Sequence, residues 1–211
     1  MRKILYLWDL GGTLFPEKWN SEKTGFQTYE DWAADKLGKA KEELSNKEID
    51  WTYEIPYKEG WHINLELAKG FKEVLEWAKN NEAFTSGIPE QIEWRAEYLN
   101  PRVGFDVRAF LKKINAASDY GAYNTKTKEM FLKYLNERYK QGYKIVVFTD
   151  DNLKYCDLFK QAADEQKDKH QDFSYRCYHI LNDNGGLRKK EWYFEIGNLY
   201  DLMKNEKCII G

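Results

Sequence analysis

The residues best suited to carry chemistry stand at the ends of two apolar stretches. The run from Ile4 to Trp8 is apolar at every position and stops at Asp9. The run from Tyr143 to Phe148 is interrupted only by a lysine and is followed by Thr149. Short runs that are apolar on both faces are typical of buried strands in a parallel sheet, whose ligands bind beyond the carboxyl ends of the strands. The pattern therefore predicts a carboxylate and an anion-binding hydroxyl at one edge of a sheet.

The first run continues into a segment with two glycines, Gly11 and Gly12, which allow the main chain to turn sharply and approach a ligand. The segment from Asp9 to Phe15, Asp-Leu-Gly-Gly-Thr-Leu-Phe, resembles motif I of the haloacid dehalogenase-like hydrolases, Asp-x-Asp-Gly-Thr-apolar. The resemblance implies that Asp9 is the nucleophile and that Gly12 and Thr13 contact the substrate. At Gly11 the family has instead the carboxylate that acts as general acid and base. A strand that merely leads into a glycine turn is the alternative.

The second run resembles motif II of the same family, an apolar strand that ends in Ser or Thr. The segment from Val146 to Thr149 carries this resemblance, which implies that Thr149 binds the transferred phosphoryl group and that Asp150 contacts the substrate. An ordinary strand end is the alternative. So is a role at the start of the next helix, shared with Asp151 or Asn152.

A cluster of basic residues near the C-terminus resembles motif III, in which a lysine offsets the charges of the nucleophile and the phosphoryl group. The segment from Gly186 to Glu191 is similar to the pattern Gly-x-Arg-Lys-Pro-Asp, with Lys190 in place of the proline. This alignment gives the role to Lys189. Lys190 is the alternative, and a solvated cluster of charges is the other interpretation.

The acids that bind Mg²⁺ in the family, its motif IV, are expected after one further strand. The segment from Cys208 to Gly211 resembles that strand, so the acids would lie beyond Gly211 and the sequence is expected to be a fragment. Asp183 is a substitute acid in principle, but we interpret it as a turn residue. The resemblance implies that Mg²⁺ is held by the carboxylate of Asp9, by the main-chain carbonyl of Gly11 and by those further acids.

The order of the apolar patterns predicts an α/β protein with a Rossmann-like, three-layer core and a parallel sheet. Residues 1–16 and 120–211 are assigned to this core, and residues 17–119 to an inserted, all-helical cap domain without strands. Helices are expected over residues 24–37, 62–79, 89–100, 107–114 and 192–203. Strands are expected over residues 143–148, 176–181 and 208–210.

Composition excludes several classes of function. The net charge is −2 and Lys and Glu are interspersed, so no basic surface for nucleic acid is expected. No stretch approaches the ~20 apolar residues of a membrane helix, and the first apolar run is too short for a signal peptide. An odd number of cysteines, none with Cys or His at zinc-ligand spacing, predicts buried, reduced thiols in a cytoplasmic protein. These are Cys156, Cys177 and Cys208.

Together these features predict a hydrolase that acts on a small phosphorylated metabolite through an aspartyl-phosphate intermediate. Without a carboxylate at position 11 the enzyme should be slow on poor leaving groups, because general acid–base help is typically worth about 10²–10⁴ in rate. A non-catalytic phosphate- or nucleotide-binding protein of the same fold is the alternative, and a haloacid dehalogenase-type hydrolase is a third.

Overall fold

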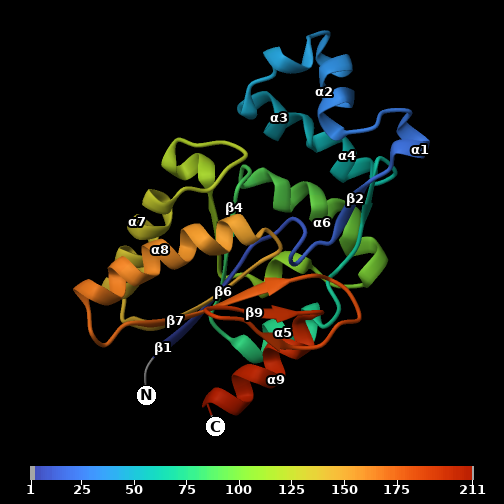
Figure 1. The fold of residues 1–211 in the computed structure, drawn as a ribbon. Coiled ribbons are helices and arrows are strands. Elements are labelled where there is room, and N and C mark those ends of the chain that lie inside the picture. Colours follow the sequence, from blue (N-terminus) through green and yellow to red (C-terminus); the bar gives the residue numbers. More distant parts are fainter. Residues whose placement is uncertain (1–2, 211) are drawn as a thin grey trace.

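The computed structural model describes residues 3–210, and a seven-stranded sheet runs through its centre (Figure 1). The strand order is β5-β4-β1-β6-β7-β9-β8, and every neighbouring pair is parallel except β8 and β9. The strands are β1 Lys3–Trp8, β4 Asn81–Thr85, β5 Lys113–Ala116, β6 Tyr143–Asp150, β7 Ser174–Ile180, β8 Arg188–Lys189 and β9 Phe194–Ile196. The sheet is thus mostly parallel, as predicted.

Strand β1 shows why the chain forms this core. Alternate side chains of a strand point to opposite faces, and both faces of β1 are apolar. Leu5 and Leu7 join the core cluster on one face of the sheet, while Tyr6 and Trp8 join the cluster on the other. Because both faces are buried, β1 lies at the middle of the sheet, between β4 and β6.

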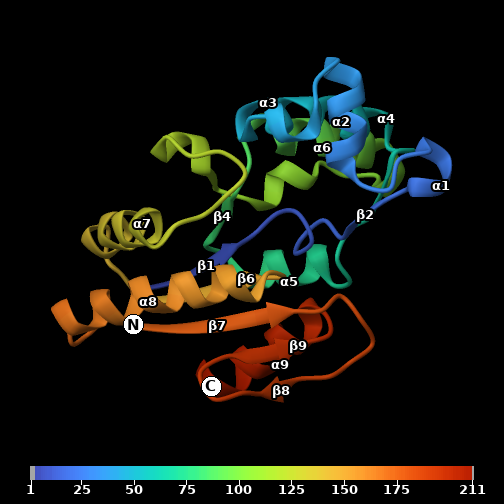
Figure 2. The same cartoon turned by 45° about the horizontal axis from the view of Figure 1, so that its top comes forward.

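Helices cover both faces of the sheet and complete a three-layer arrangement (Figures 1 and 2). Helices α7 Lys128–Lys140 and α8 Leu153–Lys169 pack against each other and on β6. Helices α5 Phe71–Ala78 and α9 Leu199–Ile210 pack together, with their apolar residues in the opposite cluster. The α/β architecture predicted for the core is therefore present.

A helical lobe, residues 17–65, is inserted between β1 and α5. Strands β2 Glu17–Trp19 and β3 Ile63–Leu65 pair antiparallel, so the chain leaves and returns at the same place. Between them lie α1 Ser21–Thr24, α2 Tyr29–Leu37, the 3₁₀ turn η1 Lys41–Glu43, α3 Asn46–Thr52 and α4 Glu54–Glu59. Helix α4 packs on α6 Glu90–Val103, and Figure 2 shows α2, α3 and α4 gathered near α6.

The prediction of an all-helical segment over residues 17–119 is wrong, because β4 and β5 belong to the main sheet. Strand β4 was not predicted because its sequence, Asn-Glu-Ala-Phe-Thr, is polar, although every one of its residues is buried. Its polar groups have partners inside the protein. Asn81 accepts a hydrogen bond from the Trp8 indole at 2.8 Å, and Glu82 pairs with Arg138 at 2.7 Å. Paired polar groups of this kind can be buried without a large penalty.

Two other predicted helices are shorter than expected. The helix expected over residues 62–79 is divided into β3 and α5, because Gly70 before α5 has a left-handed φ of 89°. The helix expected over residues 107–114 is the 3₁₀ turn η2 Val107–Phe110, followed by β5 and η3 Ala117–Tyr120. The helix expected to end before Pro101 continues to Val103.

The C-terminal region also differs from the prediction. Residues 192–203 form β9 and the start of α9 rather than one helix. The strand expected over residues 208–210 is the last turn of α9, and Cys208 is exposed, whereas Cys156 and Cys177 are buried as predicted. Within residues 3–210, no helix combines the length and apolar character needed to cross a membrane.

Candidate active site

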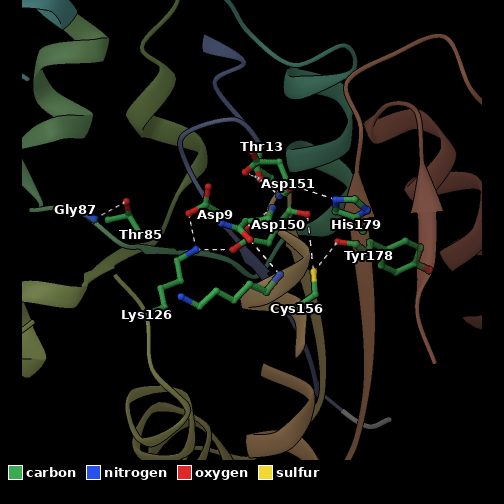
Figure 3. A network of polar contacts seen from close by, with 12 residues as sticks. Asp9, Thr13, Thr85, Gly87, Lys126, Asp150, Asp151, Cys156, Tyr178 and His179 are labelled. Atoms are coloured by element: carbon green, nitrogen blue, oxygen red, sulfur yellow. Dashed lines mark hydrogen bonds and ion pairs between the residues drawn. The ribbon is translucent and has the colours of Figure 1, made fainter. Parts of the chain in front are cut away.

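Asp9 lies where β1 ends, at the middle of the sheet (Figure 3). Its side chain is buried, and its backbone N–H donates to the carbonyl of Thr149 at 2.9 Å. The carboxylate oxygen Oδ1 accepts a hydrogen bond from Lys126 Nζ at 2.6 Å. The predicted nucleophile is therefore buried, ionically paired and positioned by two adjacent strands.

Lys126 is the cation of the site, and the sequence analysis missed it. It precedes α7, whose N-cap is Thr127, and its side chain is fully enclosed. Its Nζ contacts Asp9 at 2.6 Å and Asp150 Oδ2 at 2.5 Å. Burial lowers the pKa of Lys126, but the charges of Asp150 and Asp9 outweigh burial and raise the pKa above its ordinary value. Lys126 is therefore an ammonium ion at neutral pH.

Two further carboxylates approach Asp9 from the end of β6. Carboxylate oxygens of Asp9, Asp150 and Asp151 lie within 4.8 Å of one another. Burial and the charge of Asp9 raise the pKa of Asp150, against the opposing effect of Lys126. Desolvation and the charge of Asp9 raise the pKa of Asp151 to about 7. The carboxylates therefore repel one another even with the ammonium in place.

The donor set fits a divalent cation. When all three carboxylates are ionised, they and the ammonium of Lys126 carry a net charge of −2. Carboxylate oxygens are the ligands that Mg²⁺ prefers, and one divalent ion neutralises the remaining charge. Gly211, beyond which the further acids were predicted, is outside the described residues. Within the described residues, Asp150 and Asp151 place two carboxylates beside Asp9. The strand expected over residues 208–210, which was to lead to the further acids, is wrong because these residues are helical. The presence of acids beyond Gly211 stays a prediction.

A hydroxyl-bearing loop flanks Asp9 on its other side. Strand β4, the second neighbour of β1, ends at Thr85, which is buried and whose Oγ1 accepts a hydrogen bond from the N–H of Gly87 at 3.3 Å. Ser86 lies between them, and α6 starts shortly afterwards at Glu90. Hydroxyls and free N–H groups ahead of a helix form an anion site. A strand end with a hydroxyl just ahead of a helix, the arrangement expected around Thr149, is therefore also found around Thr85.

Thr149 itself does not face the site. It is fully buried on β6, and its Oγ1 has no hydrogen-bond partner among residues 3–210. Of the described residues, the cavity beside Asp9 is lined by Asp150 and Asp151 but not by Thr149. The sequence pattern identified the strand end that borders the cavity. It assigned phosphoryl binding to Thr149, however, whose side chain does not face the cavity.

Lys189 also lies away from Asp9. It is exposed on β8, the last strand of the sheet, and β6, β7 and β9 lie between β8 and β1. The side chain of Lys190 pairs with Glu195 at 2.9 Å and is largely exposed. Asp183 accepts a hydrogen bond from the N–H of Gly185 at 2.7 Å, which agrees with its interpretation as a turn residue. The basic cluster is thus a surface feature of an edge strand.

The segment that contains Gly11, Gly12 and Thr13 links the end of β1 to the end of β6 by hydrogen bonds. Thr13 Oγ1 accepts a hydrogen bond from the N–H of Asp151 at 2.9 Å and also contacts its carboxylate at 3.3 Å. Gly12 has a φ of 73°, and a Cβ there would lie 2.1 Å from Asp151 Oδ2, so only glycine fits. Thr13, predicted to contact substrate, instead positions Asp151. Gly11 and Gly12 line the cavity with Asp9.

The cavity above Asp9 has a volume of about 370 Å³. Its floor is the sheet edge, and its upper wall comes from the helical lobe and α6. The lobe and α6 contribute polar and aromatic side chains: Glu17, Asp50, Tyr53, Tyr57, Gln91 and Arg95. A pocket of this size suits a small molecule.

The chain matches no protein-family model and no curated protein sequence. The resemblance to the haloacid dehalogenase-like hydrolases therefore stays a prediction from the sequence motifs.

Proposed function

We propose that this protein is a Mg²⁺-dependent hydrolase of small phosphate esters, with Asp9 as nucleophile. One observation carries the proposal: the buried carboxylate of Asp9 contacts Lys126 at 2.6 Å and lies within 4.8 Å of the acids Asp150 and Asp151. Thr85 ends the neighbouring strand β4, on the same cavity. A nucleophile, a cation, metal-ligating oxygens and hydroxyl donors are the parts that phosphoryl transfer requires.

The chemistry follows from the residues. A carboxylate oxygen of Asp9 attacks the phosphorus, the bond to the ester oxygen breaks, and a phosphoryl-aspartate forms. The ammonium of Lys126 offsets the charges that Asp9 and the phosphoryl group bring together. Thr85 and the N–H groups after it hold phosphoryl oxygens. Asp9, Asp150 and Asp151 would hold Mg²⁺, which would supply further positive charge against the same repulsion. Water then releases phosphate and restores Asp9.

The helical lobe is proposed to act as the cap that selects the substrate. Asp50, Tyr53 and Tyr57 of the lobe line the cavity opposite Asp9. These groups face the part of the substrate that is attached to the phosphoryl group, so they determine which alcohol is accepted. The residues at the sheet edge carry out the reaction. A cavity of about 370 Å³ favours a small phosphorylated metabolite over a polymer.

The test is hydrolysis of p-nitrophenyl phosphate and a panel of phosphorylated metabolites, with and without Mg²⁺. We expect Asp9→Asn to abolish turnover, since an amide is a poor nucleophile. Asp31→Asn is the matched control, because Asp31 forms an exposed ion pair with Lys41 in the lobe. Equal rates for the wild-type protein and Asp9→Asn would overturn the proposal.

One observation favours a second candidate, a phosphate-binding protein without turnover. Position 11 is glycine, so the motif has no second carboxylate to transfer a proton. This candidate predicts that inorganic phosphate binds, by calorimetry, with Mg²⁺ present, while no ester in the panel is hydrolysed.

A further inference from the structure

The space beside Gly11 is occupied by a carboxylate from another part of the chain. A Cβ built on Gly11 would lie 2.9 Å from Glu17 Oε1 and 3.0 Å from Arg95 Nη2. Glu17 starts β2 of the helical lobe, and Arg95 comes from α6. Glu17, Gly11 and Asp9 line the same cavity. An acid is therefore present where the motif lacks one.

Glu17 is held firmly. Arg95 Nη2 donates to Glu17 Oε2 at 3.1 Å, and the hydroxyl of Tyr57 donates to Oε1 at 3.3 Å. Arg95 Nη2 also donates to the Tyr57 hydroxyl at 2.6 Å, and its guanidinium lies 4.0 Å from the centre of the Tyr57 ring. The Arg95 side chain is 2% exposed, while that of Glu17 is 24% exposed. The carboxylate is thus fixed in direction but remains accessible from the cavity.

The other carboxylates around the cavity are engaged in different tasks. Asp9 and Asp150 contact Lys126, and Asp151 is held by Thr13. Asp50 accepts hydrogen bonds from main-chain and side-chain amides of its neighbours. Burying a guanidinium is costly, so the enclosed Arg95 is weak evidence for stability and stronger evidence for a role in positioning Glu17.

We propose that Glu17 is the proton-transfer residue of the site, an inference that rests on the proposed hydrolase function. As Asp9 attacks and the phosphorus–oxygen bond breaks, the Glu17 carboxyl gives its proton to the departing oxygen, which leaves as an alcohol. The Glu17 carboxylate then takes a proton from the water that attacks the phosphoryl-aspartate. Phosphate departs, the Asp9 carboxylate returns, and Glu17 is again protonated.

The first experiment compares two leaving groups. Glu17→Gln keeps the shape of the side chain and removes the proton. We expect a rate loss of about 10²–10⁴-fold on glycerol phosphate, whose alcohol leaves poorly, and a much smaller loss on p-nitrophenyl phosphate, whose phenolate needs no proton. Glu66→Gln, an exposed position next to the β3 partner of Glu17, is the matched control. Equal losses on both substrates would assign Glu17 a structural role and overturn the inference.

The second experiment moves the carboxylate. Gly11 does not have a left-handed φ, so a side chain is tolerated once Glu17 is shortened. We expect Glu17→Ala to lose activity on glycerol phosphate and Gly11→Asp in that background to recover at least tenfold. Gly11→Asp alone should give no gain, because it crowds Glu17. A gain in the wild-type background without any loss in Glu17→Ala would contradict the inference.

The two proposals fail differently. If Asp9→Asn is inactive while Glu17→Gln matches wild type on glycerol phosphate, the hydrolase function stands and the role of Glu17 is overturned. If wild type and Asp9→Asn have equal rates, both proposals fall.

Discussion

The central ion pair of the sheet edge and the outer ion pair of the helical lobe differ in how far they are exposed. At the sheet edge, Lys126 and Asp150 are enclosed and contact each other at 2.5 Å. In the lobe, the ion pair between Lys41 and Asp31 is largely exposed, and pairs of that kind contribute about 0–1 kcal/mol. The lobe depends instead on a cluster of aromatic side chains that includes Tyr29 and Trp32.

The difference separates two tasks. Enclosed charges must be desolvated, and their mutual attraction seldom repays that loss in stability. Where a fold retains them at the ends of central strands, their fixed positions serve a reaction rather than folding. The lobe has a cluster of its own and touches the cavity with a few polar side chains. We therefore expect substitutions at the sheet edge to change kcat and those in the lobe, apart from Glu17, to change KM.

The largest expected effect contrasts two lysines. Lys126→Ala should lower kcat by about 10²–10³-fold, the usual loss when one charge-stabilising group is removed from an active site. Lys189→Ala should leave kcat unchanged, because Lys189 is exposed on the edge strand β8. Steady-state rates on p-nitrophenyl phosphate, with circular dichroism to check folding, make the comparison. A larger loss in Lys189→Ala would return the role to the basic cluster.

A second prediction concerns stability and pH without divalent metal. The folded-state pKa of Asp151 is about 7, above the ordinary carboxyl value of about 4, so the folded protein keeps this proton to higher pH than the unfolded chain. Stability should therefore fall as pH rises from about 4 to about 7. Asp151→Asn should show a smaller fall in urea melts across this range.

Mg²⁺ should offset the loss of stability that the ionised carboxylates cause. A ligand that binds only the folded state at 100 times its Kd adds about 2.7 kcal/mol. The gain should be larger at pH 8, where the acids are ionised, than at pH 5, and Asp151→Asn should weaken it. Equal stabilisation at both pH values, or in both proteins, would show that the ion binds elsewhere.

The parts of the site that could be predicted are those whose signal lies in adjacent residues of the sequence. Asp9 follows a run that is apolar on both faces, and such a run is typical of a central strand. Asn152 caps α8 directly after β6, and a cap in this segment was one of the alternatives that the sequence left open. These features depend on neighbours in the chain, so sequence alone contains them.

The missed residues depend on contacts distant in sequence. Lys126, 117 residues from Asp9, stands in a segment with other lysines and resembles a solvated residue. Thr85 is the last residue of β4, a strand that was not predicted because its buried Asn81 and Glu82 are polar. A usable signal did exist for the acids, since two consecutive aspartates follow the apolar run of β6. It was assigned to capping and substrate contact instead.

The smallest expected effect tests the contact between the lobe and the sheet edge. Asp50 of α3 accepts a hydrogen bond from the N–H of Asn124 at 3.0 Å, two residues before Lys126, and another from Gln91 at 3.2 Å. Asp50→Asn removes the charge and weakens these bonds by about 1 kcal/mol, which corresponds to about a fivefold change in an equilibrium. If the lobe selects substrate, KM should rise by about that factor while kcat stays within twofold, and Asp31→Asn should change neither. A fall in kcat comparable to that of Lys126→Ala would instead mean that the lobe and the sheet edge act as one unit, because the segment carrying the lysine would then depend on α3 for its position.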